Sequence, residues 1–289
     1  MKTYKTLLFA LLISLMFTGC ENMISEVDAP ATEPKLVVYS VLSPQSDVIK
    51  VRLNKSRPLY TRWNYENNNG YLTVNNATVK ISDGVTAKTL LFDSADDHYK
   101  IDSSEFRIIP GNKYFLEITT PEGDKATAEC TVPTGTHPAI ELTGIDTQTE
   151  YGETVYMVNF RFRDTPGSDQ NYYVAPAYIF FEEISGTEYI YEIGLSKGDS
   201  FFTDKNKDGE YFIFRSSGIH SSVIGSNFEF MVFLSITGDE LYQYQKSVTG
   251  FQGDNPFQEP VPIYSNIKGG LGIFSAENTV YATIPFAIR

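Results

Sequence analysis

Cysteine and histidine are scarce in this sequence, which holds two cysteines and three histidines in 289 residues. So few cysteines provide no disulfide framework, and the fold must therefore depend on its hydrophobic core. The histidines, His98, His137 and His220, lack the close spacing of zinc ligands. We interpret them as surface or turn residues rather than as a joint metal site.

Basic residues are outnumbered, with 23 Lys and Arg against 36 Asp and Glu, and the formal net charge is -13. A chain this acidic repels phosphate backbones and anionic headgroups, which argues against nucleic acid as a partner. The acidity supports solubility. An alternative interpretation is that it attracts cationic or metal-bearing ligands.

The apolar run near the N-terminus is too short to remain in a membrane as a helix. It reads LLFALLISLMF from Leu7 to Phe17, whereas a spanning helix needs about 20 apolar residues. Lys2 and Lys5 precede this run, and Thr18 and Gly19 follow it. A basic start, a short apolar stretch and a small-residue exit are typical of a secretory signal peptide.

The end of this run, FTGC, resembles the lipobox of bacterial lipoproteins. The resemblance implies cleavage after Gly19, a diacylglyceryl group on the sulfur of Cys20, and attachment to a membrane through this N-terminal lipid. The alternative is an ordinary signal peptide followed by a chance cysteine. Residues 20–35 have two prolines and no apolar periodicity, so we expect an acylated tether between the leader over 1–19 and the folded body.

The rest of the chain predicts a mainly β fold. In VIKVRLN, Ile49, Val51 and Leu53 alternate with polar residues, and Cys130 lies on the apolar side of a similar strand. Short strands separated by Gly and Pro turns are typical of antiparallel sandwiches. We expect an N-terminal immunoglobulin-like or transthyretin-like β-sandwich over 36–135 and a larger antiparallel β domain over 136–289.

One short helix is predicted in the second domain, near residues 238–249. TGDE has Thr237 at the N-cap and Glu240 three residues later, which is the pattern of a capping box. Leu241, Tyr244 and Val248 then recur with helical spacing, and we expect them to pack against the second sheet.

Two short motifs suggest chemistry. GLSKG over 194–198 matches the nucleophile elbow around Ser196, but no helical pattern follows it as that motif requires. In DKNKDGE, Asp204, Asn206 and Asp208 could offer oxygens to calcium, although Asp-Gly is also a strong hairpin turn. The plain turn is the preferred interpretation, calcium is the alternative, and no other cofactor is expected.

The C-terminal stretch contains Gly269, Gly270 and Gly272 without the Lys-Ser/Thr of a phosphate loop, so we expect a bulge or a close backbone approach there. This stretch, EPVPIYSNIKGGLGIF, resembles the signature of a Bacteroidota lipoprotein family named as a domain of unknown function, DUF4249. ATVKISDG, PGNKYFLEITTPEGDKATAECTVP and FRFRDTPGSDQNYY support the resemblance in the same order.

The resemblance implies an outer-membrane lipoprotein of a family often encoded near TonB-dependent receptors. It carries over no catalytic residues. The residues after Cys20, Glu21 to Met23, do not match an export motif, so both a surface-exposed and a periplasm-facing position stay open.

These observations predict a lipid-anchored, non-enzymatic accessory protein that captures a solute or contacts a TonB-dependent transporter. The alternative is a structural or adhesive surface protein that contacts other proteins. A hydrolase that uses Ser196 or the carboxylates is a third hypothesis.

Overall fold

The computed structural model describes residues 33–57, 72–167, 169–182, 187–224, 228–251 and 262–284. The predicted leader, Cys20 and most of the tether lie outside these described residues. Signal cleavage and lipid attachment therefore stay predictions.

The first half of the chain consists of β1 (Leu36–Leu42), β2 (Val48–Lys55), β3 (Leu72–Thr73), β4 (Thr78–Ser82), β5 (Ala87–Asp93), β6 (His98–Asp102), β7 (Lys113–Thr119) and β8 (Lys125–Thr131). The second half begins with β9 (Ile140–Glu150), β10 (Glu153–Arg163), β11 (Asn171–Glu182), β12 (Thr187–Glu192), β13 (Leu195–Lys197) and β14 (Phe201–Thr203). It continues with β15 (Tyr211–Ser216), β16 (Ile219–His220), the 3-10 turn η1 (Ser221–Val223), β17 (Glu229–Thr237), the helix α2 (Asp239–Gly250) and β18 (Gly270–Ile284).

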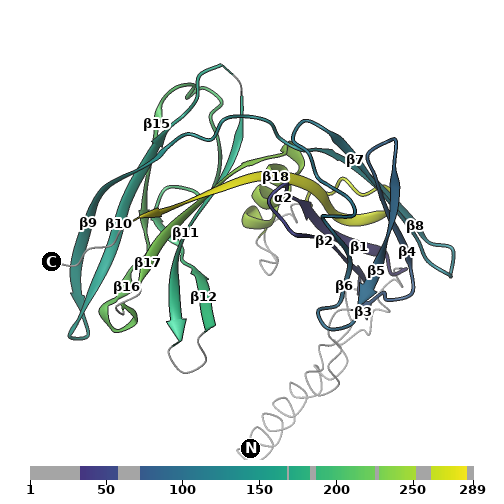
Figure 1. Ribbon diagram of the computed structural model, residues 1–289, viewed down its shortest axis with the longest axis horizontal. Helices are drawn as coiled ribbons and strands as arrows, with labels where there is room; N and C mark the ends of the chain where they lie inside the picture. Colours follow the sequence, from purple (N-terminus) through teal and green to yellow (C-terminus); the bar gives the residue numbers. More distant parts are fainter. Residues whose placement is uncertain are drawn as a thin grey trace, which may run out of the picture.

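The last strand, β18, joins the two halves of the molecule (Figure 1). Its first part, residues 270–276, pairs in parallel with β1, and its second part, residues 277–284, pairs antiparallel with β17. The result is a 13-stranded sheet with the order β12-β11-β17-β18-β1-β2-β6-β5-β4-β7-β8, with β14 and β3 as side branches. The mainly β prediction is confirmed, although the β1–β18 pairing is parallel rather than antiparallel.

The strands of the first half enclose one hydrophobic core. Ile49, Val51 and Leu53 of β2 are each at most 3% exposed, which confirms the predicted row. Ile267 and Phe274 belong to the same core although they come from the C-terminal segment. Residues far beyond position 135 therefore complete the packing of this half.

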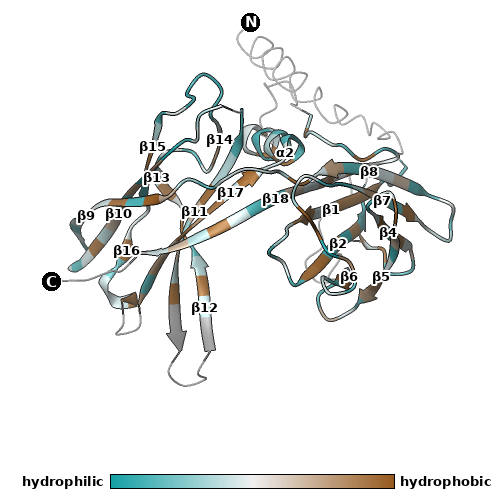
Figure 2. Cartoon of the chain, turned by 45° about the horizontal axis from the view of Figure 1, so that its top comes forward, coloured by the Kyte–Doolittle hydropathy of each residue, from teal (hydrophilic) through white to brown (hydrophobic). Residues whose placement is uncertain are grey.

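A second core lies between strands β11 and β17 of the large sheet and a five-stranded sheet that contains β9, β10, β13, β15 and β16. Its centre is aromatic: Phe160 stacks on Phe214 with ring centroids 5.3 Å apart. From β17, Phe230, Val232, Leu234 and Ile236 belong to this core, and each is at most 2% exposed. Strands alternate between hydrophobic and hydrophilic residues in Figure 2, as two-layer packing requires.

Strand β10 changes its inward-facing parity along its length. Val158, Phe160 and Phe162 are buried, but Tyr156, at the same alternation, is only half-buried. Its neighbours Val155 and Met157 are buried instead. The pairing with β9 is irregular between Asn159 and Phe160, close to this change. Such an irregularity explains the change, because a bulge re-aims the side chains of a strand.

The three C-terminal glycines lie where strands approach each other closely, as predicted. A Cβ on Gly272, whose φ is +102°, would lie 1.9 Å from the carbonyl oxygen of Val38 in β1. A Cβ on Gly269 would lie 2.2 Å from the carbonyl oxygen of Lys125, and one on Gly270 would meet the carbonyl of Leu36 at 2.8 Å. Only glycine fits this part of the chain without a shift of the backbone.

The predicted helix is present, but the predicted capping box is wrong. The N-cap is Gly238, with no side-chain cap, and Thr237 is the last residue of β17. Pairing with Glu277 and Asn171 keeps Thr237 in the sheet, so its side chain is unavailable to the first turn. Its Oγ1 has no hydrogen-bond partner among the described residues.

One side of α2 rests on the large sheet, where it contacts β18, β14 and β11. Leu241 is buried, and the ring of Tyr244 lies 6.2 Å from the ring of Tyr39 in β1. Val248 is 39% exposed, so the prediction that it packs with these two residues is wrong. Within the described ranges, no helix combines the length and the apolar composition needed to cross a membrane.

Cys130 has the buried position that its strand pattern predicts, with 2% of its surface exposed. Burial, followed by the charges of Glu240 and Glu129, raises the pKa of its thiol. We therefore expect Cys130 in a Cys20→Ser protein to react with a thiol reagent only after unfolding. Reaction rates with dithionitrobenzoate in buffer and in urea test this, and equal rates would contradict a sealed thiol.

Candidate functional site

A pocket of about 500 Å³ lies on the outer side of β7 and β8. Phe115 and Glu117 of β7, with Thr127 and Glu129 of β8, form one wall, because alternate residues of these strands point away from the core. Residues 264–268 and the start of α2 form the other walls. The lining residues are Phe115, Leu116, Glu117, Thr127, Ala128, Glu129, Glu240, Tyr264, Ser265, Asn266, Ile267 and Lys268.

Residues 264–268 are held against β8 by the backbone. The amide of Thr127 donates to the carbonyl oxygen of Lys268 at 2.9 Å, and the amide of Lys268 donates to that of Thr127 at 2.8 Å. The pocket thus joins the two stretches PGNKYFLEITTPEGDKATAECTVP and EPVPIYSNIKGGLGIF, which are far apart in the sequence.

Asn266 fixes the turn that leads from the pocket into β18. Its Oδ1 accepts from the amide of Phe274 at 3.0 Å, and its Nδ2 donates to the carbonyl of Phe274 at 2.7 Å. Its Nδ2 also donates to the carbonyl of Glu129 at 3.3 Å. Sequence reasoning missed this residue, and the only signal for it was its place in the C-terminal motif.

Carboxylates dominate the charge of the pocket. The lining contains three carboxylates, Glu117, Glu129 and Glu240, and one cation, Lys268. Glu129 is also 2.9 Å from the Nζ of Lys113, beside the pocket. Burial raises the pKa of Glu240, and the nearby charges of Asp239 and Glu129 raise it further, whereas Lys113 lowers it.

Two aromatic side chains line the pocket together with these acids. Phe115 is half-buried on β7, and Tyr264 lies on the segment that closes the pocket. Burial and the charges of Glu240 and Asp239 raise the pKa of Tyr264, so its hydroxyl stays protonated. Carboxylates beside aromatic rings are the side chains that hold organic cations.

The predicted calcium residues lie in a turn between β14 and β15. Asp204 Oδ1 accepts from the amide of Gln170 at 2.8 Å, and Asp208 Oδ1 accepts from the amide of Gly167 at 2.9 Å. Asn206 has a left-handed φ of 69°. The two aspartates therefore fasten this turn to the 164–170 loop by separate amides.

Asp164 is the residue of this region that sequence reasoning missed. It is 2% exposed, accepts from the Tyr172 hydroxyl at 2.6 Å and accepts from the Gly209 amide at 3.0 Å. Asp204 is 1% exposed, and burial followed by the charges of Asp164 and Asp169 raises its pKa. No group of three or more His, Cys, Asp or Glu side chains in the described residues is placed to hold a metal, so calcium stays a prediction without a ligand shell.

Ser196 is the middle residue of β13 rather than the apex of a strand-to-helix turn. Its hydroxyl donates to the carbonyl oxygen of Ser216 at 2.8 Å. Strand β14 follows, where a nucleophile elbow would have a helix. This position gives Ser196 a structural hydrogen bond and no elbow.

A second pocket of about 400 Å³ lies beside Ser196 and the 204–210 turn. Lys197 and Lys207 line it together with Asp199 and the aromatic side chains of β14 and β15. The Nζ of Lys207 lies 5.7 Å from the centre of the Phe212 ring, so the ring already faces a cation of the chain itself. We therefore take the first pocket as the candidate site.

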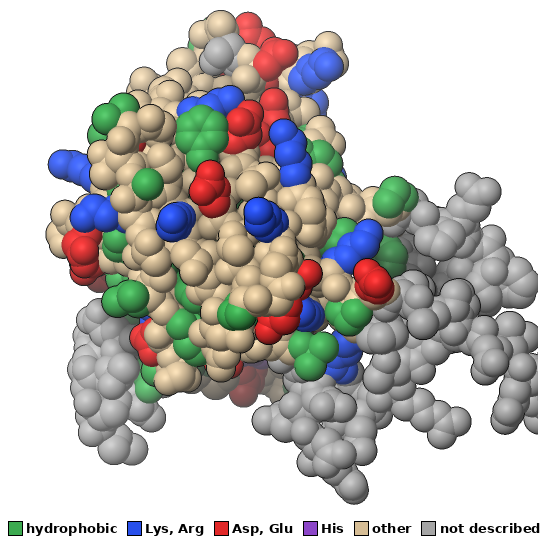
Figure 3. Space-filling view, turned by 90° about the vertical axis from the view of Figure 1, so that its right-hand side faces the viewer, with side chains coloured by type: hydrophobic (Ala, Val, Ile, Leu, Met, Phe, Trp, Pro, Cys, Tyr) green, Lys and Arg blue, Asp and Glu red, His purple; other side chains and the backbone are tan. Residues whose placement is uncertain are grey.

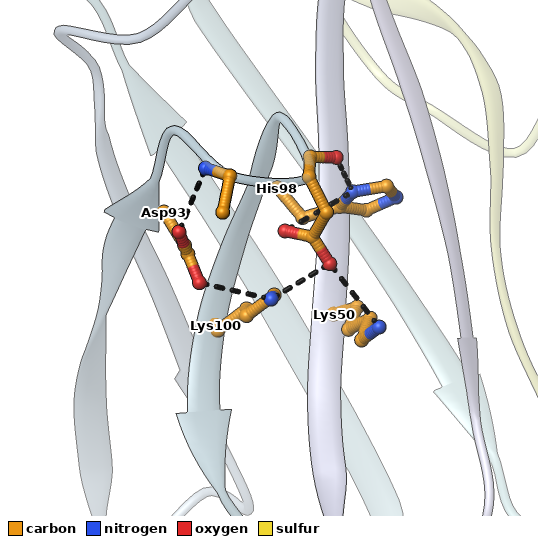
Figure 4. A network of polar contacts seen from close by, with 6 residues as sticks. Lys50, Asp93, His98 and Lys100 are labelled. Carbon is orange, nitrogen blue, oxygen red and sulfur yellow. Dashed lines mark hydrogen bonds and ion pairs between the residues drawn. The ribbon is translucent and has the colours of Figure 1, made fainter. Parts of the chain in front are cut away.

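The three histidines lie on different elements. His98 belongs to a surface network in which Lys100 is 3.0 Å from Asp93 and 2.7 Å from Asp96 (Figure 4). The Nζ of Lys50 is 3.3 Å from Asp96, and the network holds the β5–β6 turn. His137 Nε2 lies 2.7 Å from the carbonyl oxygen of Asn278, and His220 is 3.5 Å from Glu153.

Basic and acidic side chains are interspersed on the outer face of the N-terminal half (Figure 3). This view shows no single-sign basic patch of the kind that binds phosphate backbones. That nucleic acid is not a partner stays a prediction from the net charge of -13.

The comparisons with known proteins give a family and little else. The family model described as Domain of unknown function (DUF4249) matches residues 24–281. A crystal structure from Bacteroides uniformis, whose name proposes carbohydrate binding, is 9% identical, with a TM-score of 0.17, over 71% of this chain and 89% of that chain. A similarity this low carries no argument about fold or function. No curated protein matches the chain.

Proposed function

The chain belongs to the family described as Domain of unknown function (DUF4249), and on that premise we propose that it is a lipid-anchored, non-enzymatic binding protein of the cell envelope. It holds a small positively charged solute and serves a TonB-dependent transporter. The observation that carries the proposal is the pocket between β7, β8, α2 and residues 264–268. Its volume of about 500 Å³ is in the range of small-molecule sites.

Charge and shape support a cationic solute. The half-buried carboxylate of Glu240 has acidic neighbours, and a bound ammonium or guanidinium would relieve their repulsion. Phe115 and Tyr264 line the same pocket, and aromatic rings attract cations. The overall charge of -13 favours the approach of such a solute over a distance.

Glu240→Gln should change how the stability of the protein depends on pH. The raised pKa means that folding favours protonated Glu240, so the wild type loses stability as pH rises from the ordinary Glu pKa to the raised value. The variant lacks this loss, and its advantage in melting temperature should grow over that window and then level off. Thermal unfolding at several pH values between about 4 and 7 measures it.

The same variant should bind cations less well. Loss of one charge-assisted contact costs about 1.5–3 kcal/mol, so we expect agmatine or spermidine to bind about 10- to 100-fold more weakly by calorimetry. Glu105→Gln, on the exposed turn after β6, is the control and should bind as the wild type does. Unchanged affinity in Glu240→Gln would refute a site at this pocket, as would equal binding of neutral glucose.

The anchor and the transporter are tested on the native protein. Cys20→Ala should move the protein from the membrane fraction to the soluble fraction, and mass spectrometry of the wild type should show the acyl groups. Cross-linking in intact outer membranes should recover a TonB-dependent receptor. Repeated recovery of none would count against the accessory role.

The alternative role, structural or adhesive, makes a different prediction for a deletion strain. Loss of attachment with unchanged solute uptake would favour it. Reduced uptake with normal attachment would favour the accessory role.

A further inference from the structure

Strand β12 forms an open end of the large sheet. It pairs with β11 on one side, and no strand of the described residues pairs with its other side. The opposite end differs, because residue Lys268 bridges to Thr127 of the last strand there, β8. Figure 1 shows β12 projecting with β11 from the body of the second half.

The pairing identifies which backbone groups of β12 face away from the sheet. The amide of Ile193, directly after β12, donates to the carbonyl of Pro176 in β11 at 2.9 Å. Backbone groups of an antiparallel strand alternate in direction, so Tyr191 and Tyr189 also face β11. The N–H and C=O groups of Ile190 and Glu192 therefore point outward.

This edge lacks several of the features by which proteins usually protect one, although it carries two glutamates. The sequence TEYIYE contains no Lys and no Pro, and its register with β11 runs without a shift. Tyr189, Ile190 and Tyr191 are 42%, 56% and 46% exposed. Tyr191 stacks on Tyr178 with ring centroids 5.5 Å apart, which holds the apolar side of the edge in place.

We propose that β12 receives an extended segment of a partner protein as an added strand, and that this segment alternates apolar residues with Lys or Arg. Unpaired backbone groups give such pairing its affinity, and side chains at alternate positions give its specificity. The exposed carboxylate of Glu192 and the charge of -13 select a basic partner.

Charge also argues against a second copy of this chain as the occupant. Two copies of charge -13 repel, and antiparallel pairing centred on Ile190 would place Glu192 opposite Glu188 of the other copy. Like charges directly opposite destabilise a strand pair.

The direct probe is a peptide of about six residues, the usual strand length, that alternates Lys with Val. Fluorescence anisotropy should show binding to the wild type. A peptide N-methylated at alternate amides, and a Glu-Val peptide, should bind at least about tenfold more weakly, a difference of about 1.4 kcal/mol. Equal binding of the N-methylated peptide would overturn the proposal whatever the protein variants do.

Ile190→Pro tests the edge within the protein. Its amide faces away from β11, so proline should leave the fold and melting temperature close to those of the wild type. It should reduce affinity for the Lys-Val peptide at least about tenfold. Ile190→Thr keeps the amide and should still bind the peptide. Unchanged binding by Ile190→Pro would place the partner elsewhere.

Two further measurements separate the competing explanations. Sedimentation should show a monomer, and a dimer that Ile190→Pro abolishes would overturn the assigned occupant in favour of a second copy. Glu240→Gln should bind the Lys-Val peptide as the wild type does, so failure of the pocket proposal and failure of this one are distinguishable.

Discussion

Gly272→Ala is expected to lower the free energy of unfolding by about 3–5 kcal/mol. The new methyl group would clash with the backbone of β1, and the φ at this position is strained for every residue except glycine. The new Cβ would lie 1.9 Å from the Val38 carbonyl oxygen, and the φ of +102° disfavours any side chain. Relief would require β18 to move away from β1, which opens the ladder between the two strands. Urea denaturation measures the loss.

Gly123→Ala is the matched control for this experiment. Gly123 has a similar φ of +96°, but nothing lies within 4 Å of its Cβ position. Its variant reports the conformational term alone, which we expect to be about 1–2 kcal/mol. Equal losses in the two variants would show that the close approach of β18 to β1 adds nothing to stability.

The isolated fragment 36–135 is expected to lack a cooperative unfolding transition. It loses the parallel partner of β1, together with Ile267 and Phe274 from its core. Deletion of one buried Phe side chain alone costs about 3–5 kcal/mol, against a usual total stability of about 5–15 kcal/mol. Far-UV circular dichroism during heating tests this.

A peptide that covers residues 264–276 should restore the transition when added to the fragment. It returns the Asn266 turn and the first part of β18. The same peptide with Gly272→Ala should fail to do so. A fragment that melts cooperatively without the peptide would show that the first half folds independently of the C-terminal segment.

Local periodicity was enough to predict the buried faces of some strands, such as β2 and β8. The alternation of Ile49, Val51 and Leu53 and the buried position of Cys130 follow from the two-residue period of a strand whose one face meets the core. The parallel pairing of β1 with β18 does not follow from periodicity, because it depends on the order of strands across the whole sheet.

The errors at α2 have a related cause. TGDE has the composition of a capping box, but the ladder of β17 with β11 and β18 continues through Thr237 and orients its side chain. The helix therefore begins at Asp239, and its N-cap is Gly238, one residue later than predicted. Tertiary pairing overrode a local preference at this point.

The candidate pocket was only partly visible in the sequence. Its acids lie on the outward face of strands and at the start of a helix, positions where charge usually means only contact with water. Glu129 and Glu240 line the same pocket because residues 264–268 cross β8 at Thr127. A contact between such distant segments leaves no periodic signal in either one.

The position of β18 also sets the order in which the protein can be assembled. In a chain that emerges with its N-terminus first, β1 appears long before its partner Gly270–Ala276. The first half must therefore wait, incompletely paired, until residues 270–276 have been made. Such a wait leaves the unpaired edge of β1 open to aggregation until its parallel partner is available.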